Sequence, residues 1–233
     1  MQALHKLIAA AFACALLAGC AAPMAPEASR ANRRPPVRLV VLGDSLAFGT
    51  GASEPTGGFA FRLYDRIARE RPGIEIASYA IGGTTVADVE RLEVARLRGT
   101  HPDVILLCVG GNDVVRRTDP AAFAASYALT VAAIRTNAPH ARLILFGVPN
   151  VAVSPLFADF DAAAVERLSR ADDRAVRATA AHARASFVDL FALSSAARHN
   201  VGFFSSDQFH PSDDGHERIA RYALPTLERA LHS

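Results

Sequence analysis

The sequence predicts an α/β fold, a three-layer α/β/α sandwich around a five-stranded parallel sheet. Two observations carry this prediction. Short apolar runs alternate with longer segments of helical period, and the runs are apolar at successive positions rather than at every second one. A strand that is apolar on both sides is buried on both faces, which is typical of a parallel sheet covered by helices. The alternation of strands and helices therefore indicates a doubly wound arrangement.

The expected elements follow one another over a single stretch of chain. The apolar runs, which we expect to form strands, are Leu39–Leu42, Ile74–Ala80, Val104–Val109, Leu143–Val148 and Ser186–Leu190. The expected helices are Gly58–Glu70, Val86–Leu97, Ala121–Asn137, Asp161–Ala183 and Asp213–Leu231. Start signals agree with this division, because Asp119 can cap a helix that has Pro120 at its first position, and Ser212 can cap the last helix.

The first 19 residues are expected to be a lipoprotein signal peptide rather than part of the fold. The apolar stretch Leu7–Ala18 follows a short segment that carries Lys6, and it is too short to span a bilayer. It ends in Leu17-Ala18-Gly19-Cys20, which resembles the bacterial lipobox. The resemblance implies cleavage before Cys20 and lipidation of its thiol. The alternative is an ordinary signal peptide that contains a cysteine.

Residues 20–36 are expected to be the lipidated cysteine and a disordered tether, and residues 37–233 a single folded domain. The tether is rich in Ala and Pro and has no apolar period. The remaining length suits one domain with a full core. Several acyl chains would hold the protein firmly to a membrane of the cell envelope. By the same resemblance, Ala21 in place of Asp favours the periplasmic face of the outer membrane.

Composition and charge give no reason to expect a nucleic-acid partner. Loss of the signal peptide removes the only Lys and leaves 24 Arg against 23 Asp and Glu. Cys108 would then be the one thiol within the domain, in a strand where it is expected to be a small core residue. No cluster has metal-ligand spacing and no Gly-rich loop precedes a suitable Lys, so neither a metal nor a cofactor is expected. The sequence leaves the oligomeric state open, with a monomer as the default.

Polar motifs stand where strands are expected to end. They are Gly43-Asp44-Ser45 after the first strand, Ile81–Thr85 after the second, Gly110–Asp113 after the third and Asp207–His210 before the last helix. In doubly wound folds, active sites lie beyond the carboxyl ends of the strands. We therefore expect these motifs to meet at one edge of the sheet.

The residue types in these motifs fit nucleophilic catalysis. A Ser hydroxyl needs a general base within hydrogen-bond reach, and His210 can be that base for Ser45. Asp207, three residues earlier, can orient the imidazole; the alternative for this pair is an acidic surface turn that caps a helix. The oxyanion needs aimed donors, and the candidates are the Ser45 N–H, the Gly83 N–H and the Asn112 side chain. Each alone could be an ordinary turn residue.

Four stretches together resemble the SGNH or GDSL hydrolase family. They are VVLGDSLAFGTG (40–51), AIGGTT (80–85), VGGND (109–113) and SDQFHPSDDGH (206–216). The resemblance implies a flavodoxin-like fold with Ser45 as nucleophile, His210 as base and Asp207 as its partner. It also implies an oxyanion hole formed by Ser45, Gly83 and Asn112.

The second of these stretches departs from the family pattern in two ways. Ser78 stands where the family usually has Asn. Adjacent Gly82 and Gly83 also allow two registers, of which the spacing from Ile81 favours Gly83. Neither departure removes a chemical group that the mechanism requires.

Apolar residues in or beside the same loops suggest the substrate. The candidate pocket residues are Phe48, Val115, Phe204 and Phe209. An apolar entrance to the active site favours fatty acyl esters, lysophospholipids or acyl thioesters as substrates over acetylated sugars. The absence of Trp mildly disfavours a carbohydrate substrate. The leading hypothesis is a lipid-anchored serine esterase. A carbohydrate O-acetylesterase is the nearest alternative. A non-catalytic envelope lipoprotein that binds lipid or a partner is an alternative of another class.

Overall fold

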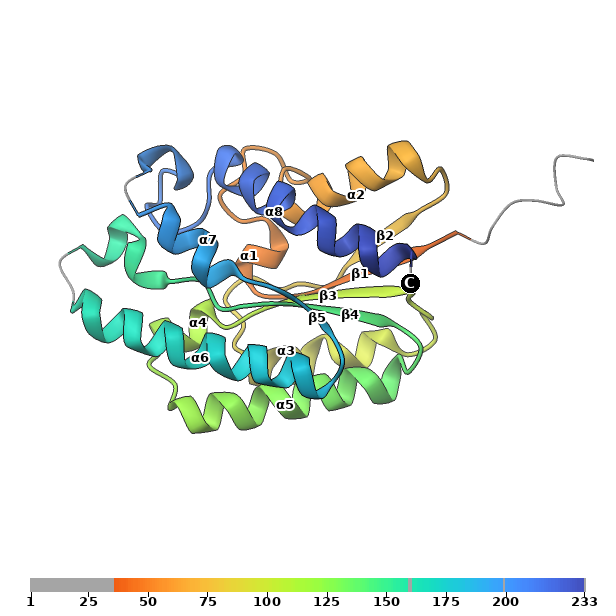
Figure 1. Cartoon of the computed structure of the whole chain (residues 1–233), viewed down its shortest axis with the longest axis horizontal. Coiled ribbons are helices and arrows are strands. Elements are labelled where there is room, and N and C mark those ends of the chain that lie inside the picture. Colours follow the sequence, from red (N-terminus) through yellow and green to blue (C-terminus); the bar gives the residue numbers. More distant parts are fainter. Residues whose placement is uncertain (1–35, 159–160, 199, 233) are drawn as a thin grey trace, which may run out of the picture. The chain divides into compact units, whose positions relative to one another are not determined.

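The computed structural model describes residues 36–158, 161–198 and 200–232, and the five expected strands form one parallel sheet (Figure 1). The strands are β1 (Arg38–Gly43), β2 (Glu75–Ser78), β3 (Val104–Cys108), β4 (Arg142–Phe146) and β5 (Ser186–Val188). Their order in the sheet is β2-β1-β3-β4-β5, and each neighbouring pair is parallel. The nucleophile candidate therefore follows a strand flanked by β2 and β3, whose own loops carry the motifs Ile81–Thr85 and Gly110–Asp113.

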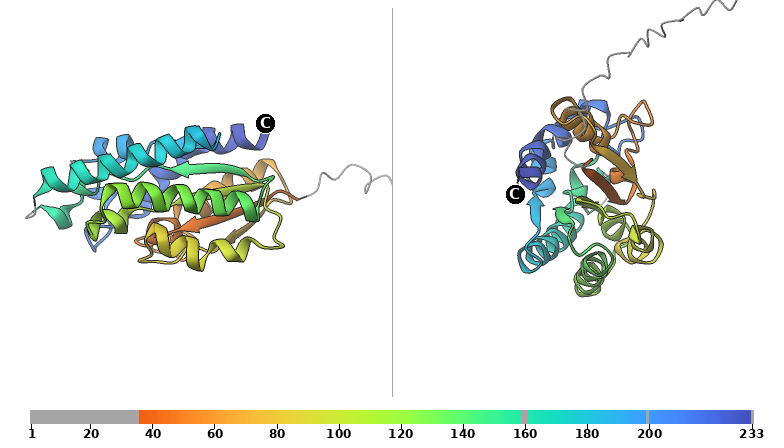
Figure 2. Two further views of the ribbon diagram at one scale, coloured as in Figure 1. Left: turned by 90° about the horizontal axis from the view of Figure 1, so that it is seen from below. Right: turned by 90° about the vertical axis from the view of Figure 1, so that its right-hand side faces the viewer.

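Helices cover both faces of the sheet, which confirms the three-layer prediction (Figures 1 and 2). On one face lie α2 (Phe59–Glu70), α7 (Leu190–Ala196) and α8 (Asp213–His232). On the other lie α3 (Val86–Leu92), α5 (Pro120–Asn137) and α6 (Ala162–His182), which Figure 2 shows side by side. No helix within the described residues is long and apolar enough to cross a membrane.

Alternate residues of each strand contribute to two separate hydrophobic cores. In β1, Leu39 and Val41 pack toward α2 and α8, whereas Val40 and Leu42 pack toward α3 and α5. The same division holds in β3, where Cys108 is a buried free thiol. A central strand of this sheet buries side chains on both faces, and this is why its sequence is apolar at successive positions.

The remaining helices are short. They are α1 (Ser45–Phe48), α4 (Gly111–Val115) and the 3₁₀ turns η2 (Val94–Leu97), η3 (Val151–Val153), η4 (Pro155–Phe157) and η5 (Val201–Phe203). The expected helix Val86–Leu97 is thus divided at Glu93, which turns inward and is buried. The predicted signal peptide, the lipidation at Cys20 and nearly all of the tether lie outside the described residues.

Candidate active site

The turn after β1 can be formed only by glycine at its first position. Gly43 has a φ of +136°, and a Cβ there would lie 1.8 Å from the Cys108 carbonyl oxygen of the neighbouring strand. The Asp44 N–H then donates to that same carbonyl, at 3.1 Å. Ser45 follows as the first residue of α1, so its N–H has no acceptor within the helix. This tight turn places the Ser45 hydroxyl at the carboxyl end of the sheet.

The Asp44 carboxylate joins the loops after β1 and β3. One oxygen accepts from the Leu46 N–H (3.0 Å) and so caps α1, while the other accepts from the Gly110 N–H (3.2 Å). Burial raises the pKa of Asp44 to about 6, although the hydrogen bonds from Leu46, Gly110 and Gly111 act in the opposite direction. Asp44 therefore fixes the loops after β1 and β3 relative to each other.

Ser45, His210 and Asp207 form one continuous hydrogen-bonded chain. His210 Nε2 lies 2.8 Å from Ser45 Oγ, and its Nδ1 lies 2.6 Å from Asp207 Oδ2. The other carboxylate oxygen of Asp207 accepts from the backbone N–H groups of Phe209 and His210 and from the Ser205 hydroxyl. Burial raises the pKa of Asp207, but these hydrogen bonds outweigh burial and hold it well below the ordinary value. The structure thus brings together residues separated by most of the chain.

Backbone contacts fix the segment that carries His210. The Ser205 N–H donates to the His210 carbonyl at 2.8 Å, and Phe204 forms an isolated antiparallel bridge with Pro211. Ser212 then caps α8, as expected, by accepting from the Gly215 N–H at 3.2 Å. The imidazole is therefore held between a bridged turn and the start of a long helix.

The loops after β2 and β3 also reach the neighbourhood of Ser45. The Asn112 side-chain amide donates to the Thr84 carbonyl at 2.9 Å, and Asn112 lines the same pocket as Ser45. A Cβ on Gly82 would lie 3.9 Å from Ser45 Cβ, whereas a Cβ on Gly83 would meet nothing within 4 Å. A side chain at Gly82 would thus point toward the nucleophile, whereas one at Gly83 would point into open space.

His216 lies on α8, six residues after His210 in sequence, and supports the fold. It is fully buried, and burial lowers its pKa below the ordinary value. Its Nδ1 accepts from the Phe59 N–H at 3.2 Å, and its Nε2 lies 3.0 Å from the Thr50 carbonyl oxygen. His216 thus links α8 to the start of α2 and to the loop after α1. His101, His140 and His182 are exposed.

Glu93 is a buried residue beneath the nucleophile that sequence reasoning missed. Its Oε2 accepts from the Gly43 N–H at 2.8 Å, while its Oε1 has no hydrogen-bond partner among the described residues. Burial above all, and next the charge of Asp44, raise its pKa to about 8, against the opposing hydrogen bond from Gly43. The sequence contains a signal for this burial. Glu93 falls at the same helical interval after Val89 as Leu97 falls after Glu93, which places it on the apolar face of the expected helix.

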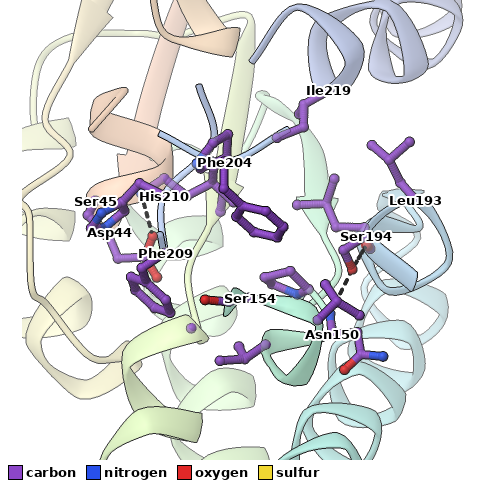
Figure 3. Close-up of a pocket in the computed structure, with 18 of the residues that line it drawn as sticks. Asp44, Ser45, Asn150, Ser154, Leu193, Ser194, Phe204, Phe209, His210 and Ile219 are labelled. Atoms are coloured by element: carbon purple, nitrogen blue, oxygen red, sulfur yellow. Dashed lines mark hydrogen bonds between the residues drawn. The ribbon is translucent and has the colours of Figure 1, made fainter. Parts of the chain in front are cut away.

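An apolar pocket opens beside Ser45 and has a volume of about 70 Å³ (Figure 3). Its apolar lining comes mainly from the loop after β4, from α7 and α8, and from the segment before His210. These residues are Val109, Pro149, Val151, Val153, Leu190, Leu193, Phe203, Phe204, Phe209, Pro211 and Ile219. Phe204 and Phe209 thus line the pocket, as expected. Phe48 and Val115 do not line it and are 57% and 44% exposed.

No group of three or more His, Cys, Asp or Glu side chains within the described part of the chain is arranged to hold a metal ion. The polar residues around Ser45 are instead hydrogen-bonded to one another or to the backbone. The connected set Asp207, His210 and Ser45 has the geometry that chemistry at a hydroxyl group assisted by an imidazole requires.

Comparisons with known proteins agree with this geometry. The model of the GDSL-like lipase/acylhydrolase family matches residues 41–218. Esterase TesA of Pseudomonas aeruginosa is 26% identical over 216 residues, which cover 93% of this chain and 98% of that protein. A crystal structure of TesA superposes with a TM-score of 0.69 at 25% identity, covering 83% of this chain and 99% of that one.

Solved structures that are less similar in sequence share the same fold. Esterase EstA from Pseudoalteromonas is 19% identical, with a TM-score of 0.67 over 84% of this chain and 99% of its own. A lipolytic G-D-S-L protein from Veillonella parvula is 17% identical with the same TM-score, over 83% of this chain and 99% of its own. By the family match across residues 41–218, the chain belongs to the GDSL-like lipase/acylhydrolase family and is a carboxylic ester hydrolase.

Proposed function

We propose that this protein hydrolyses acyl esters through a covalent acyl-Ser45 intermediate, with His210 as general base and acid and Asp207 as its orienting partner. The observation that carries the proposal is the unbroken chain of hydrogen bonds from Asp207 through His210 to Ser45, at 2.6 and 2.8 Å. Both distances lie within the reach that proton transfer requires.

The first half of the reaction transfers the acyl group to Ser45. The Ser45 oxygen attacks the ester carbonyl carbon while its proton passes to Nε2 of His210. The ionised Asp207 accepts from Nδ1–H, keeps the imidazole in the tautomer that can take this proton, and stabilises the imidazolium. His210 then gives the proton to the leaving alcohol oxygen as the carbon–oxygen bond of the ester breaks.

The negative charge that develops on the carbonyl oxygen needs donors in fixed positions. We assign these to the Ser45 N–H, to a backbone N–H of the loop that contains Gly83, and to the Asn112 side chain. One hydrogen of the Asn112 amide already donates to the Thr84 carbonyl, which fixes the amide and leaves its second hydrogen for the substrate.

The second half of the reaction returns the enzyme to its starting state. A water molecule takes the place of the leaving alcohol, and His210 accepts its proton as its oxygen attacks the acyl carbon. The tetrahedral intermediate collapses, the bond to Ser45 Oγ breaks, and His210 returns the proton to Ser45. The products are the carboxylic acid and the free hydroxyl of Ser45.

The proposed substrates are esters of fatty acyl groups, with lysophospholipids and acyl thioesters among the candidates. The apolar lining next to Ser45 supports this class over acetylated carbohydrates, whose recognition needs free polar groups. An enzyme that cleaves acetate esters and loses activity steeply with each longer chain would instead favour a carbohydrate O-acetylesterase.

Replacement of the nucleophile tests the mechanism. Ser45→Ala should abolish hydrolysis of p-nitrophenyl butyrate, while Ser126→Ala, on the distant α5, should keep it. Both variants should give the far-ultraviolet circular dichroism spectrum of the parent protein. A serine-reactive phosphonate should add one adduct mass to the parent protein and none to Ser45→Ala. Hydrolysis retained by Ser45→Ala would refute the proposal.

We further propose that the enzyme is anchored to the cell envelope by lipid on Cys20, at the periplasmic face of the outer membrane. The lipobox-like sequence Leu17–Cys20 supports this placement. The measurement is the mass of the mature N-terminal peptide, which should begin at Cys20 and carry acyl chains. A mature chain that begins elsewhere without lipid would exclude the anchor.

A further inference from the structure

The loop after α1, residues 49–52, lies between the nucleophile and the base. Its Thr50 N–H donates to the Ser45 carbonyl oxygen at 2.9 Å, just beyond the end of the helix that begins at Ser45. Gly51, the next residue, packs against the chain at His210. A Cβ on Gly51 would lie 2.9 Å from His210 Cβ and would overlap the carbonyl oxygen of the residue that follows His210. The 49–52 loop therefore touches the chain at both partners of the hydrogen bond between Ser45 and His210.

His216 holds the 49–52 loop against α8. Its Nδ1 accepts from the Phe59 N–H at 3.2 Å, so the proton of the neutral imidazole is on Nε2, which donates to the Thr50 carbonyl oxygen at 3.0 Å. His216 is fully buried, and burial lowers its pKa below the ordinary value, which keeps the ring neutral at neutral pH. Thr50 is therefore bonded on one side to the backbone of Ser45 and on the other to an imidazole of fixed tautomer.

A second contact ties the continuation of this loop to α8. The Ser53 N–H donates to Asp213 Oδ1 at 3.3 Å, and Arg62 of α2 donates to the same oxygen at 3.0 Å. Asp213 is the first residue of α8, which begins just after the turn that carries His210. Because Asp213 and His216 both bond the start of α8 to this loop, a shift of the loop relative to α8 would move Ser45 relative to His210.

The position of His210 matters because proton transfer tolerates little error. Its Nε2 lies 2.8 Å from Ser45 Oγ, within the range over which a general base acts. A displacement of about 1 Å can lower a rate by about 10²-fold. The turn that carries His210 belongs to no strand of the sheet, and its β-structure is the isolated bridge between Phe204 and Pro211. Contacts from outside the turn are therefore needed to fix the imidazole.

We propose that the 49–52 loop is a spacer that sets the position of His210 relative to Ser45, and that His216 is a positioning residue that holds this spacer in place. The inference rests on the proposed acyl-Ser45 mechanism and adds to it a second histidine, which contacts neither the nucleophile's hydroxyl nor the imidazole that acts on it. His216 acts through Thr50 on the backbone of Ser45, and through Gly51 on His210.

Two substitutions at His216 separate its contact with Thr50 from its contact with Phe59. In His216→Asn, the side-chain oxygen can replace Nδ1 and accept from the Phe59 N–H, but the side chain is too short to reach Thr50. In His216→Gln, the amide nitrogen can replace Nε2 and donate to the Thr50 carbonyl. We expect His216→Asn to lower kcat for p-nitrophenyl butyrate by about tenfold or more with little change in KM, and His216→Gln to restore kcat to within about threefold of the parent value.

Stability distinguishes this role from a merely structural one. Each of the two variants loses one buried hydrogen bond, so the urea midpoint should fall in both. The amount of phosphonate adduct formed at Ser45 counts the active sites, and kcat is expressed per active site. A residue that only supported the fold would give the two variants the same kcat per active site.

Gly51→Ala tests the spacer from its other side. Its Cβ would press against His210, so kcat should fall by about 10²-fold with little change in KM. Gly73→Ala is the matched control, because Gly73 has nearly the same φ (+99° against +95°) but a Cβ there would meet nothing within 4 Å. It carries the same backbone strain without the contact, and should keep kcat within about twofold of the parent value.

The outcomes separate failure of this inference from failure of the mechanism. Equal kcat per active site in His216→Asn and His216→Gln, or a parent-like kcat in Gly51→Ala, would overturn the spacer role, and an inactive Ser45→Ala would leave the acyl-Ser45 mechanism standing. An active Ser45→Ala would overturn the mechanism itself. If a His216 variant does not fold, the comparison of Gly51→Ala with Gly73→Ala decides the question, and equal kcat in that pair overturns the inference.

Discussion

Replacing Glu93 with Gln should remove one large contribution to the pH dependence of the free energy of unfolding. Glu93 is fully buried beneath the nucleophile turn, and its pKa is about 8 against an ordinary value of 4.5. The unfolded chain ionises this carboxyl near the ordinary value. Between these two pH values the folded protein holds one proton more than the unfolded chain, so stability falls as pH rises.

The size of the effect follows from the width of the pH interval between the ordinary pKa of 4.5 and the pKa of about 8 in the folded protein. Each pH unit within it lowers the free energy of unfolding by about 1.4 kcal/mol, which gives at most about 5 kcal/mol across the whole interval. The stabilising contribution is complete below pH 4.5 and is lost once the pH passes about 8. Gln cannot ionise, and its side-chain oxygen can still accept from the Gly43 N–H, so Glu93→Gln should lose this slope while it keeps the turn.

Urea denaturation at about pH 5, 7 and 9 measures the prediction. Relative to the parent protein, Glu93→Gln should become more stable as pH rises, with the difference between the two proteins changing by several kcal/mol. Glu90→Gln, at an exposed position on α3, the helix that ends just before Glu93, is the control and should run parallel to the parent. If Glu93→Gln also ran parallel to the parent, the Glu93 carboxyl would make no contribution to the pH dependence, and the reasoning would be refuted.

Three further predictions concern the site and its support. Asp207→Asn should lower kcat by about 10³–10⁴-fold with little change in KM, because the imidazole loses the carboxylate that fixes its tautomer; steady-state kinetics with p-nitrophenyl butyrate measures this, and a loss under tenfold would argue against the role. Asn112→Ala should lower kcat by about 10²–10³-fold by removing an oxyanion donor, and an effect confined to KM would exclude that function. His216→Ala should destabilise the fold by about 2–4 kcal/mol, because it leaves the Phe59 N–H and the Thr50 carbonyl without their buried partner; an unchanged urea midpoint would contradict this.

The sheet and its long helices could be predicted because their signals are local. A strand in the middle of this sheet, such as β3, is apolar throughout since it faces two cores. The meeting of Ser45 with His210 was also predictable, because both follow strands in a fold whose strand ends share one edge.

Other features depend on contacts that no local pattern encodes. α1 and α4 are too short to show a helical period, and their formation depends on the turns that follow β1 and β3. The burial of His216 depends on how α8 lies against α2. The apolar pocket brings together Leu193 and Ile219, residues from two helices whose packing decides that they face the same space.

The distance along the chain between Ser45 and His210 has a consequence for when activity appears. Ser45 stands near the beginning of the domain, whereas His210 immediately precedes the final helix. A growing or partly folded chain therefore has a nucleophile without its base until α8 docks against α2 and the sheet. Ester hydrolysis should therefore begin only at the last stage of folding. A chain that is incomplete or proteolytically shortened at its C-terminal end should have no esterase activity.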